Sequence, residues 1–444
     1  MNPTFPLARS LCELGHEVVY AGVEQLRNHV EAQGYAYFVQ AVDVYPMFEH
    51  VMDNSKAGFW MHLAQTVKNR IRPKPESNRM QFARGASFNI LLRATKPDII
   101  IVDNPYAQFS LALHKTGIPF GIIQCVVNLD RRPGCPPLDS TYVPTQSRIS
   151  QWICALLWHR YFLKRFILNA VGEQQPPAEK TARRLARNAG IDPSAVGADR
   201  YSNMALKDVP EFITSPQAFD FPSSLSRNQI YIGPSVYIDR VESSCDQHFK
   251  DRFEQMIAAR ELSGTPLVYC SLGTASWRYK GVTKFLQRVL EAAEKMHWNL
   301  ILAVGNESAF SQYGGSSESI AVFKVVPQLQ VLKYADLMIT HGGMNSITEC
   351  ILSGVPMLVY PGASEFDQAG NAARVVYHGL GLQGVLARES TRGIIRNASK
   401  ILSDSQYRKR VRAMSQKIKS SQGWVSGAAI LLRTFNAKEV IPVS

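Results

Sequence analysis

The sequence predicts an α/β fold of two facing, doubly wound domains with a cleft between them. Its length of 444 residues exceeds what one hydrophobic core usually organises, and its 45% hydrophobic content is that of a globular protein. Short apolar runs alternate with helical stretches in both halves of the chain, which is the pattern of parallel sheets with crossover helices. The sequence contains neither internal repeats nor low-complexity segments.

In the first half, residues 4–14 carry apolar side chains at the three- and four-residue intervals of a helix. The strand-like runs that follow are residues 17–21, 35–40, 98–102 and 119–125. Helical stretches separate them near residues 24–32, 58–70, 79–95 and 105–116. This alternation predicts a parallel sheet with crossover helices.

The second half repeats the alternation of strands and helices. Strands are predicted at residues 266–274, 299–304, 321–326 and 337–340. The first of them ends in the small-residue loop Ser271-Leu-Gly273-Thr274, where bare backbone N–H groups and a hydroxyl can approach a phosphate. A helix with one apolar face closes the chain from Trp424.

The most informative stretch runs from His341 to Pro356. The strand before it ends at two glycines, which let the backbone turn tightly, and the next residues open a helix whose free N–H groups favour bound phosphate. Asn345, Ser346 and Glu349 fall three and four residues apart and therefore share one face of that helix. An amide and a hydroxyl near phosphates, with a carboxylate one turn on for a ribose diol, suit a nucleoside diphosphate.

Several motifs in fixed order resemble the donor-binding box of the family 1 nucleotide-sugar glycosyltransferases, the UDP-glycosyltransferase superfamily. The box opens at Val325-Val326-Pro327-Gln328, continues through His341 to Pro356 and closes at Asp367-Gln368. Isolated His-Gly-Gly or Asn-Ser pairs are usually turns or helix caps, so the ordered set is what favours this interpretation. The segment from Asn371 resembles the bacterial macrolide and zeaxanthin glucosyltransferase type.

The resemblance implies the GT-B fold, with two Rossmann-like domains, and a set of donor contacts. It implies that His341 and Ser346 contact the diphosphate, Glu349 the ribose, Gln328 the base or ribose, and Asp367 with Gln368 the sugar hydroxyls. The full expected donor-binding set is Gly273, Thr274, Val326, Gln328, His341, Gly343, Asn345, Ser346, Glu349, Asp367 and Gln368. Plant members carry a stacking Trp where Val325 stands, which leaves uracil or thymine open. The interval from Pro361 to Asp367 is longer than usual.

The start of the chain departs from the family pattern. Family members begin with a buried strand and a Gly-His-x-x-Pro turn whose His is the general base, whereas this chain starts Met1-Asn-Pro-Thr-Phe-Pro. We therefore expect the first strand and the base to be missing, with His16 a structural residue at the start of the next strand. Asp103 matches the aspartate that orients the base in the family. Without its partner, Asp103 is equally consistent with a helix cap beside Asn104.

The resemblance also sets the expected domain boundary. Tyr231-Ile-Gly-Pro is similar to the strand end before the interdomain linker of the family. We expect an acceptor-binding domain over residues 1–238 and a nucleotide-sugar-binding domain over residues 239–444. The helix at residues 424–436 is expected to cross back to the first domain.

Composition narrows the other possibilities. The formal charge is +13, but the basic residues are spread and form no nucleic-acid motif, so no nucleic-acid partner is expected. The seven cysteines are scattered and lack a Cys-x-x-Cys spacing, and the histidines show no metal-ligand spacing, so we expect reduced thiols and no metal or cofactor. The sequence shows neither a membrane-spanning run nor a secretory signal, which predicts a cytoplasmic location.

One basic and aromatic stretch, residues 152–168, allows three interpretations. It is apolar nearly all round, which favours a helix buried in the first domain with a basic exposed edge. It is also consistent with peripheral contact to an anionic membrane or with the lining of an apolar acceptor cleft.

Three functions remain open. The favoured one is an inverting, metal-independent transferase that moves a hexose, expected to be glucose, from a UDP-sugar or TDP-sugar to a hydroxyl of a lipophilic small molecule or lipid. In this hypothesis Met1 lies downstream of the true start. The second is a catalytically impaired protein that binds a nucleotide sugar without the base His. The third, a sugar-nucleotide epimerase, lacks the additional acid and base groups that such an enzyme needs.

Overall fold

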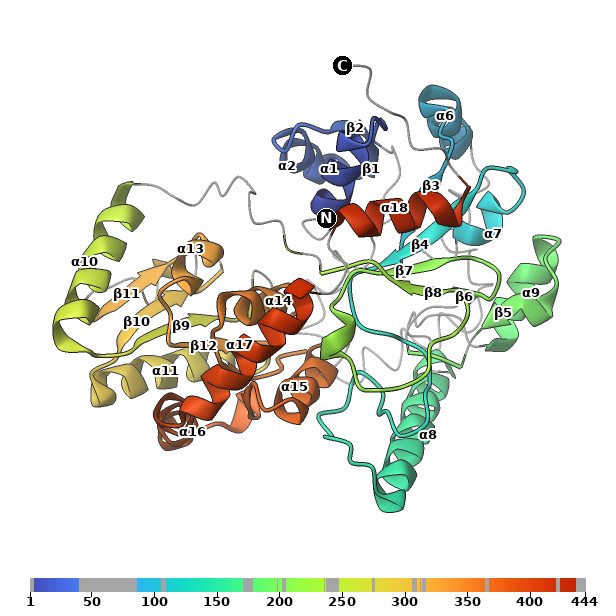
Figure 1. The fold of residues 1–444 in the computed structure, drawn as a ribbon. Helices are drawn as coiled ribbons and strands as arrows, with labels where there is room; N and C mark the ends of the chain where they lie inside the picture. Colours follow the sequence, from blue (N-terminus) through green and yellow to red (C-terminus); the bar gives the residue numbers. More distant parts are fainter. Residues whose placement is uncertain are drawn as a thin grey trace, which may run out of the picture.

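A computed structural model gives the fold, and its described residues form two α/β halves (Figure 1). The described ranges are residues 4–39, 86–104, 109–170, 179–197, 199–201, 205–234, 236, 247–273, 276–305, 310–311, 313, 317–363, 367–420 and 424–436. The helix predicted near 58–70, the first part of that near 79–95, and Thr274 lie outside them.

Most elements of the first half follow the predicted alternation. They are α1 (Phe5–Glu13), β1 (Val19–Gly22), η2 (Glu24–Leu26), α2 (Arg27–Glu31), β2 (Ala36–Val39), α6 (Ala86–Thr95), β3 (Ile100–Asp103), α7 (Ser110–Leu113), β4 (Phe120–Gln124), α8 (Arg148–Ala170), α9 (Glu179–Asn188), η4 (Pro193–Ala195), β5 (Val196–Gly197), β6 (Ala205–Leu206), β7 (Glu211–Ile213), η5 (Gln217–Phe219) and β8 (Gln229–Tyr231). The short central strand β7 was not predicted.

The parallel pairing of the first half is divided between two sheets. One holds β3, β4, β7 and β8 in that order, all parallel, and the other holds only β1 and β2. Within the described ranges no ladder joins β1 to β3, so the parallel strands there do not form a single continuous sheet. Leu7 of α1 packs with Ile123 of β4 and Phe212 of β7, so α1 covers the four-stranded sheet.

The second half contains one six-stranded parallel sheet. Its elements are α10 (Gln247–Ser263), β9 (Leu267–Ser271), η6 (Ser276–Arg278), α11 (Val282–Met296), β10 (Asn299–Ala303), β11 (Ile320–Phe323), α13 (Gln328–Leu332), β12 (Leu337–Thr340), α14 (Met344–Ser353), β13 (Met357–Val359), α15 (Gln368–Tyr377), β14 (Gly381–Gln383), η7 (Leu386–Arg388), α16 (Thr391–Ser403), α17 (Ser405–Ser420) and α18 (Trp424–Thr434).

The strands lie in the order β11-β10-β9-β12-β13-β14 and are all parallel. The chain builds the sheet outward in one direction from β9 to β11 and in the other from β12 to β14, so the strand order reverses between β9 and β12. In doubly wound sheets, ligands bind beyond the carboxyl ends of the strands at such a reversal, because the loops there diverge and leave a crevice. Separate apolar clusters cover the two faces of the sheet; Tyr269 and Met338 point into one, and Val268 and Ile339 into the other. The strand predicted at 321–326 ends earlier, at Phe323.

The last helix, α18, lies beside α1 rather than with the second sheet (Figure 1). Ala428 and Leu431 of α18 share an apolar cluster with Leu7 and Phe212. Gly427 allows this approach, because a Cβ there would lie 2.5 Å from the Ile232 carbonyl oxygen. Among the described residues, no helix is both long enough and apolar enough to cross a membrane.

A buried charge cluster joins the halves. The Asp220 carboxylate accepts hydrogen bonds from Arg374 of α15, at 2.8 and 3.0 Å, from Arg132, at 3.1 Å, and from the Tyr231 hydroxyl, at 2.8 Å. Asp220, Arg374 and Arg132 are 5%, 1% and 7% exposed. Burial alone would raise the pKa of Asp220, but the two guanidinium groups outweigh it and lower the pKa to about 2.

Replacing Asp220 with Asn should destabilise the protein by about 3 to 5 kcal/mol, because two buried guanidinium groups would lose their counter-charge. The matched control is Asp208→Asn, an exposed acid on the same half. In wild type, the depressed pKa of Asp220 contributes stability that is fully present above about pH 4 and is lost as the pH falls toward 2. Urea unfolding at several pH values measures both effects. Equal stability of the two variants at pH 7 would contradict this account.

Candidate donor site

The candidate site lies at the reversal point of the second sheet. Ser271 at the end of β9 pairs with Thr340 at the end of β12, so the loops that follow these strands start side by side. Gly273 and His341 lie on these two loops. The pairing of β9 with β12 therefore brings Gly273 and His341 to the same edge of the sheet, although nearly seventy residues separate them in sequence.

The His341 imidazole packs between two glycines. A Cβ on Gly273 would lie 3.0 Å from the ring carbon Cε1, and a Cβ on Gly343 would lie 2.6 Å from Nε2. Gly273 also has φ of +81°, which side chains other than glycine rarely adopt. The half-buried ring is crowded by protein, and this burial lowers the pKa of His341 to about 4. The imidazole is therefore neutral near pH 7 and can donate only from its single N–H.

The amino end of α14 faces the same region. Gly343 is its N-cap residue and supplies no side-chain hydrogen bond, and Ile347 N donates to the Gly343 carbonyl at 3.1 Å as a helical bond. By helix geometry the N–H groups of Met344, Asn345 and Ser346 have no partner inside the helix. They and the helix dipole favour an anion at this end.

Three predicted donor residues form one hydrogen-bonded cluster. The Gln328 side-chain amide donates to the Glu349 carboxylate at 2.6 Å and to the Ser346 hydroxyl at 3.3 Å. The Tyr269 hydroxyl donates to the Gln328 side-chain oxygen at 3.1 Å. Glu349 is 3% exposed, while Asn345, one turn earlier on the helix, is exposed.

Asp367 and Gln368 start α15, across the sheet edge from α14. The Gln368 side-chain oxygen accepts from Gly362 N at 2.9 Å and Ala363 N at 3.1 Å, and its amide donates to the Tyr279 hydroxyl at 3.0 Å. Asp367 accepts from the Asn371 amide at 2.6 Å. Burial raises the pKa of Asp367, and the bond from Asn371 opposes that shift. The Gln368 side chain thus holds the preceding loop in place. Asp367 makes fewer side-chain hydrogen bonds than Gln368.

The remaining predicted positions have different surroundings. Val326 is 6% exposed, while Val325, at the position of the plant Trp, is 45% exposed.

Tyr279, Tyr269 and Asn371 are site residues that the sequence did not assign. Tyr279 stacks on the Gly362 backbone, where a Cβ would lie 2.1 Å from its ring, and its ring centroid lies 6.3 Å from that of His341. Its only sequence signal is its place just after the Gly273 loop.

Asp103 ends β3 and pairs in register with Ile123. Its side chain reaches the surface, yet the protein atoms packed around it raise the pKa of the carboxyl. Burial, with smaller contributions from Asp103 and Asp367, also raises the pKa of the Cys125 thiol to about 12, so both carboxylates lie within electrostatic reach of one residue. Among the described residues, no hydrogen bond joins Asp103 to a histidine. Because residues 105–108 lie outside these ranges, the helix-cap interpretation stays a prediction.

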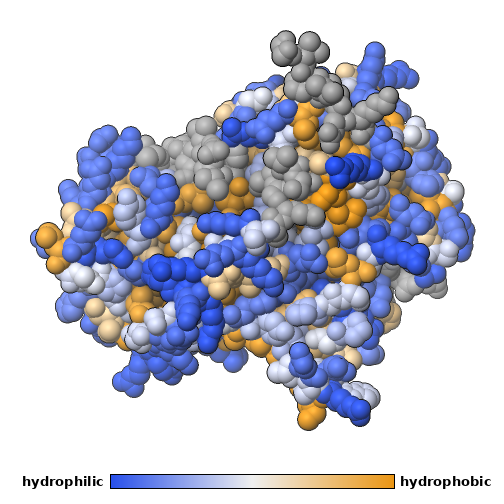
Figure 2. Space-filling view, viewed as in Figure 1, coloured by the Kyte–Doolittle hydropathy of each residue, from blue (hydrophilic) through white to orange (hydrophobic). Residues whose placement is uncertain are grey.

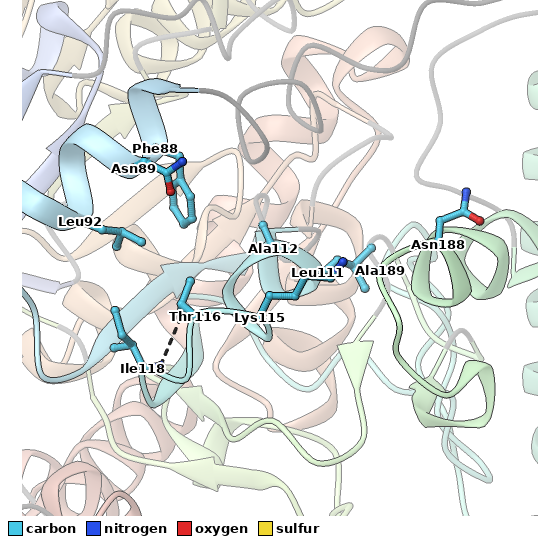
Figure 3. Close-up of a pocket in the computed structure, with 10 residues that line it drawn as sticks. All are labelled: Phe88, Asn89, Leu92, Leu111, Ala112, Lys115, Thr116, Ile118, Asn188 and Ala189. Carbon is cyan, nitrogen blue, oxygen red and sulfur yellow. Dashed lines mark hydrogen bonds between the residues drawn. The ribbon is translucent and has the colours of Figure 1, made fainter.

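A cavity of about 870 Å³ lies elsewhere in the first half (Figure 3). Its lining includes Phe88 and Leu92 of α6, and Lys115, Thr116 and Ile118 just before β4. These last residues lie at the amino end of the strand, the edge opposite Asp103. The cavity is therefore separate from the candidate donor site. In the described ranges, no group of three or more His, Cys, Asp or Glu side chains is arranged to hold a metal ion.

Known proteins resemble this chain in sequence. Residues 280–423 match the family model of the glycosyltransferase family 28 C-terminal domain. The chain is 24% identical over 446 residues to the NDP-glycosyltransferase YjiC of Bacillus subtilis (strain 168), covering 100% of this chain and 96% of that protein. It is 22% identical over 441 residues to the zeaxanthin glucosyltransferase of Pantoea ananas, covering 96% of this chain and 91% of that protein.

Solved structures show the same fold. The glycotransferase of kitacinnamycin matches with a TM-score of 0.65 at 19% identity, covering 98% of this chain and 95% of that chain. The glycosyltransferase VinC, solved in complex with DTDP, matches with a TM-score of 0.62 at 15% identity, covering 98% and 96%. The fold is therefore GT-B, as expected. Together with the sequence matches, it confirms the resemblance of this chain to the family 1 nucleotide-sugar glycosyltransferases of the UDP-glycosyltransferase type.

Proposed function

We propose that this protein transfers a hexose, glucose in the first instance, from a UDP-sugar or TDP-sugar to a hydroxyl of a lipophilic small molecule or lipid. Transfer inverts the anomeric centre and needs no metal ion. In this proposal residues 1–238 bind the acceptor and residues 239–444 the donor. The glycosyltransferase relatives support sugar transfer from a nucleotide sugar.

One observation carries the proposal. At the carboxyl edge of β9 and β12, the free amino end of α14 and the His341 ring lie beside the cluster of Gln328, Ser346 and Glu349. Anion-binding N–H groups and a carboxylate one helical turn apart match a diphosphate joined to a ribose. The exposed Val325 offers an apolar contact to a base without distinguishing uracil from thymine.

The proposed mechanism is a single displacement. A base removes the proton of the acceptor hydroxyl, the oxygen attacks the anomeric carbon, and the bond to the diphosphate oxygen breaks. The charge that develops on the diphosphate is stabilised by the α14 N–H groups, the His341 imidazole and the backbone at Gly273. Donors already fixed by packing need little reorganisation during reaction, and this favours the transition state over the bound substrate. Asp103 is the residue we assign to orienting a base.

A second candidate is a protein that binds a nucleotide sugar without transferring it. It requires only the donor cluster of Gln328, Ser346 and Glu349 and no base beside Asp103. The two candidates share the donor site and differ only in acceptor chemistry. UDP release from UDP-glucose, measured with a panel of lipophilic hydroxylated acceptors and with a chelator present, tests the transferase. Binding of UDP without release under all these conditions would leave only the second candidate.

Replacing Glu349 with Ala should weaken UDP binding by roughly tenfold to a hundredfold, since a hydrogen bond to a charged group contributes about 1.5 to 3 kcal/mol. Isothermal titration with UDP measures the loss. Glu261→Ala on α10, an exposed acid of the same half, is the matched control and should bind UDP normally. Equal affinity of the two variants would remove Glu349 from the donor site.

Binding of UDP-glucose should be constant between about pH 6 and pH 8, because His341 with a pKa of about 4 stays neutral there. His341→Asn, which keeps an N–H donor, should retain more affinity than His341→Ala. Titrations of the three proteins across this range measure both effects. An affinity that rises steadily as the pH falls toward 6 would mean that His341 binds as a cation.

Acceptor acidity should control the rate if no base assists. A nitrophenol that ionises near neutral pH should then react at least about a hundredfold faster than an aliphatic alcohol of similar size, because general-base catalysis usually contributes that much or more. Initial rates with UDP-glucose measure the ratio, with the nitrophenyl methyl ether as the control that has no hydroxyl. Similar rates for the two hydroxyl acceptors would reveal a working base.

A further inference from the structure

The long helix α8, of 23 residues, is anchored along one face only. The Trp158 indole donates to the Cys135 carbonyl oxygen at 2.8 Å, and Tyr161 stacks on Tyr201 with ring centroids 4.8 Å apart. Cys154 and Arg165 are also buried on this side. These contacts fix the orientation of the helix and leave its opposite face outward.

The outward face is strongly apolar. Its large side chains, with their exposed fractions, are Ile149 (73%), Trp152 (79%), Leu156 (69%), Leu163 (59%), Phe166 (70%) and Ile167 (51%). Their spacing follows the turns of one helix, so they form a single stripe. The prediction of a helix buried in the first domain, with a basic exposed edge, is therefore wrong for α8. The helix projects from the lower edge of the molecule, where hydrophobic and hydrophilic surface alternate (Figures 1 and 2).

Cations border the stripe. Arg148, Arg160 and Lys164 are exposed, and the sequence of α8 contains no Asp or Glu. Arg160 and Lys164 act on the carboxyl of Asp139: burial raises its pKa, and these two cations oppose that shift. The surface of α8 thus carries three exposed cations and no acid of its own, which gives it a net positive charge.

We propose that this face of α8 docks on an anionic lipid bilayer, with the helix lying parallel to the surface. Trp and Phe side chains prefer the boundary between headgroups and acyl chains, and the apolar face of such a helix is buried about 5 to 10 Å deep. The rim cations pair with anionic headgroups. This inference concerns a surface separate from the donor site and does not rest on the proposed function.

The charges favour a bilayer over a second copy of the chain. In a symmetric dimer the same patch meets itself, so the cations of one α8 would face those of the other without an acid on either helix. An anionic bilayer supplies the missing counter-charges and an apolar layer together. Because the stripe points away from the protein, it also does not line an acceptor cleft.

Flotation of the full chain with phosphatidylcholine vesicles, with and without phosphatidylglycerol, tests the proposal. The wild-type protein should float with the anionic vesicles and be released by salt, because screening weakens its headgroup contacts. The double variant Trp152→Ser, Phe166→Ser should lose at least about tenfold in partitioning, since two large aromatic side chains leave the interface. Leu262→Ser, which removes a side chain 90% exposed on α10, is the matched control and should float like wild type.

UDP binding by the double variant should equal that of wild type, which shows that its fold is intact and keeps this test independent of the donor site. Flotation of the double variant equal to wild type would overturn the proposal, as would failure of the wild type to bind anionic vesicles. A wild-type dimer in sedimentation that becomes monomeric in the double variant, without lipid binding, would assign the stripe to self-association instead.

Discussion

The position of α15 depends on the buried carboxylate of Asp220, and much of the candidate site depends on α15. Arg374 holds the helix to Asp220 with bonds of 2.8 and 3.0 Å, and Gly370 N donates to the Leu138 carbonyl at 2.7 Å. Any side chain at Gly370 would meet Leu138 at 2.6 Å. Buried ion pairs often add little stability over apolar packing, but they admit few alternative arrangements. The cluster therefore fixes where Asp367 begins the helix, relative to both halves.

The phosphate side of the site depends instead on sheet topology and small residues. Adjacent strands β9 and β12 bring Gly273 and His341 together, and a Cβ on either neighbouring glycine would displace the imidazole. The same crowding that positions the ring also keeps it uncharged. In our proposal the leaving diphosphate is therefore stabilised by oriented N–H groups and the α14 dipole. These groups do not titrate near neutral pH, so the stabilisation that they give does not change with pH there.

Local sequence predicted the parts of this site that lie on one element. Ser346 and Glu349 share a helix face, so their spacing alone placed them together, and the ordered motifs added Gln328 from 18 residues away. Tyr279 and Arg374 were missed because their partners, Gln368 and Asp220, lie 89 and 154 residues away in sequence. The division of the parallel strands of the first half between two sheets and the three-residue strand β7 depend on pairing that no local pattern encodes. Likewise, an apolar run cannot reveal which of its faces stays uncovered, as α8 demonstrates.

The two proposals meet in the first half of the chain. The helix α8 belongs to the half that we assign to acceptor binding, whereas the proposed donor residues lie in the other half. A lipophilic acceptor partitions into bilayers and is scarce in water, so a protein held at the bilayer surface meets it at a far higher local concentration. A water-soluble nucleotide sugar needs no such arrangement and reaches its site from solution. An exposed apolar stripe is a liability for a freely diffusing protein, and delivery of the acceptor would give a physical reason for keeping it on this half.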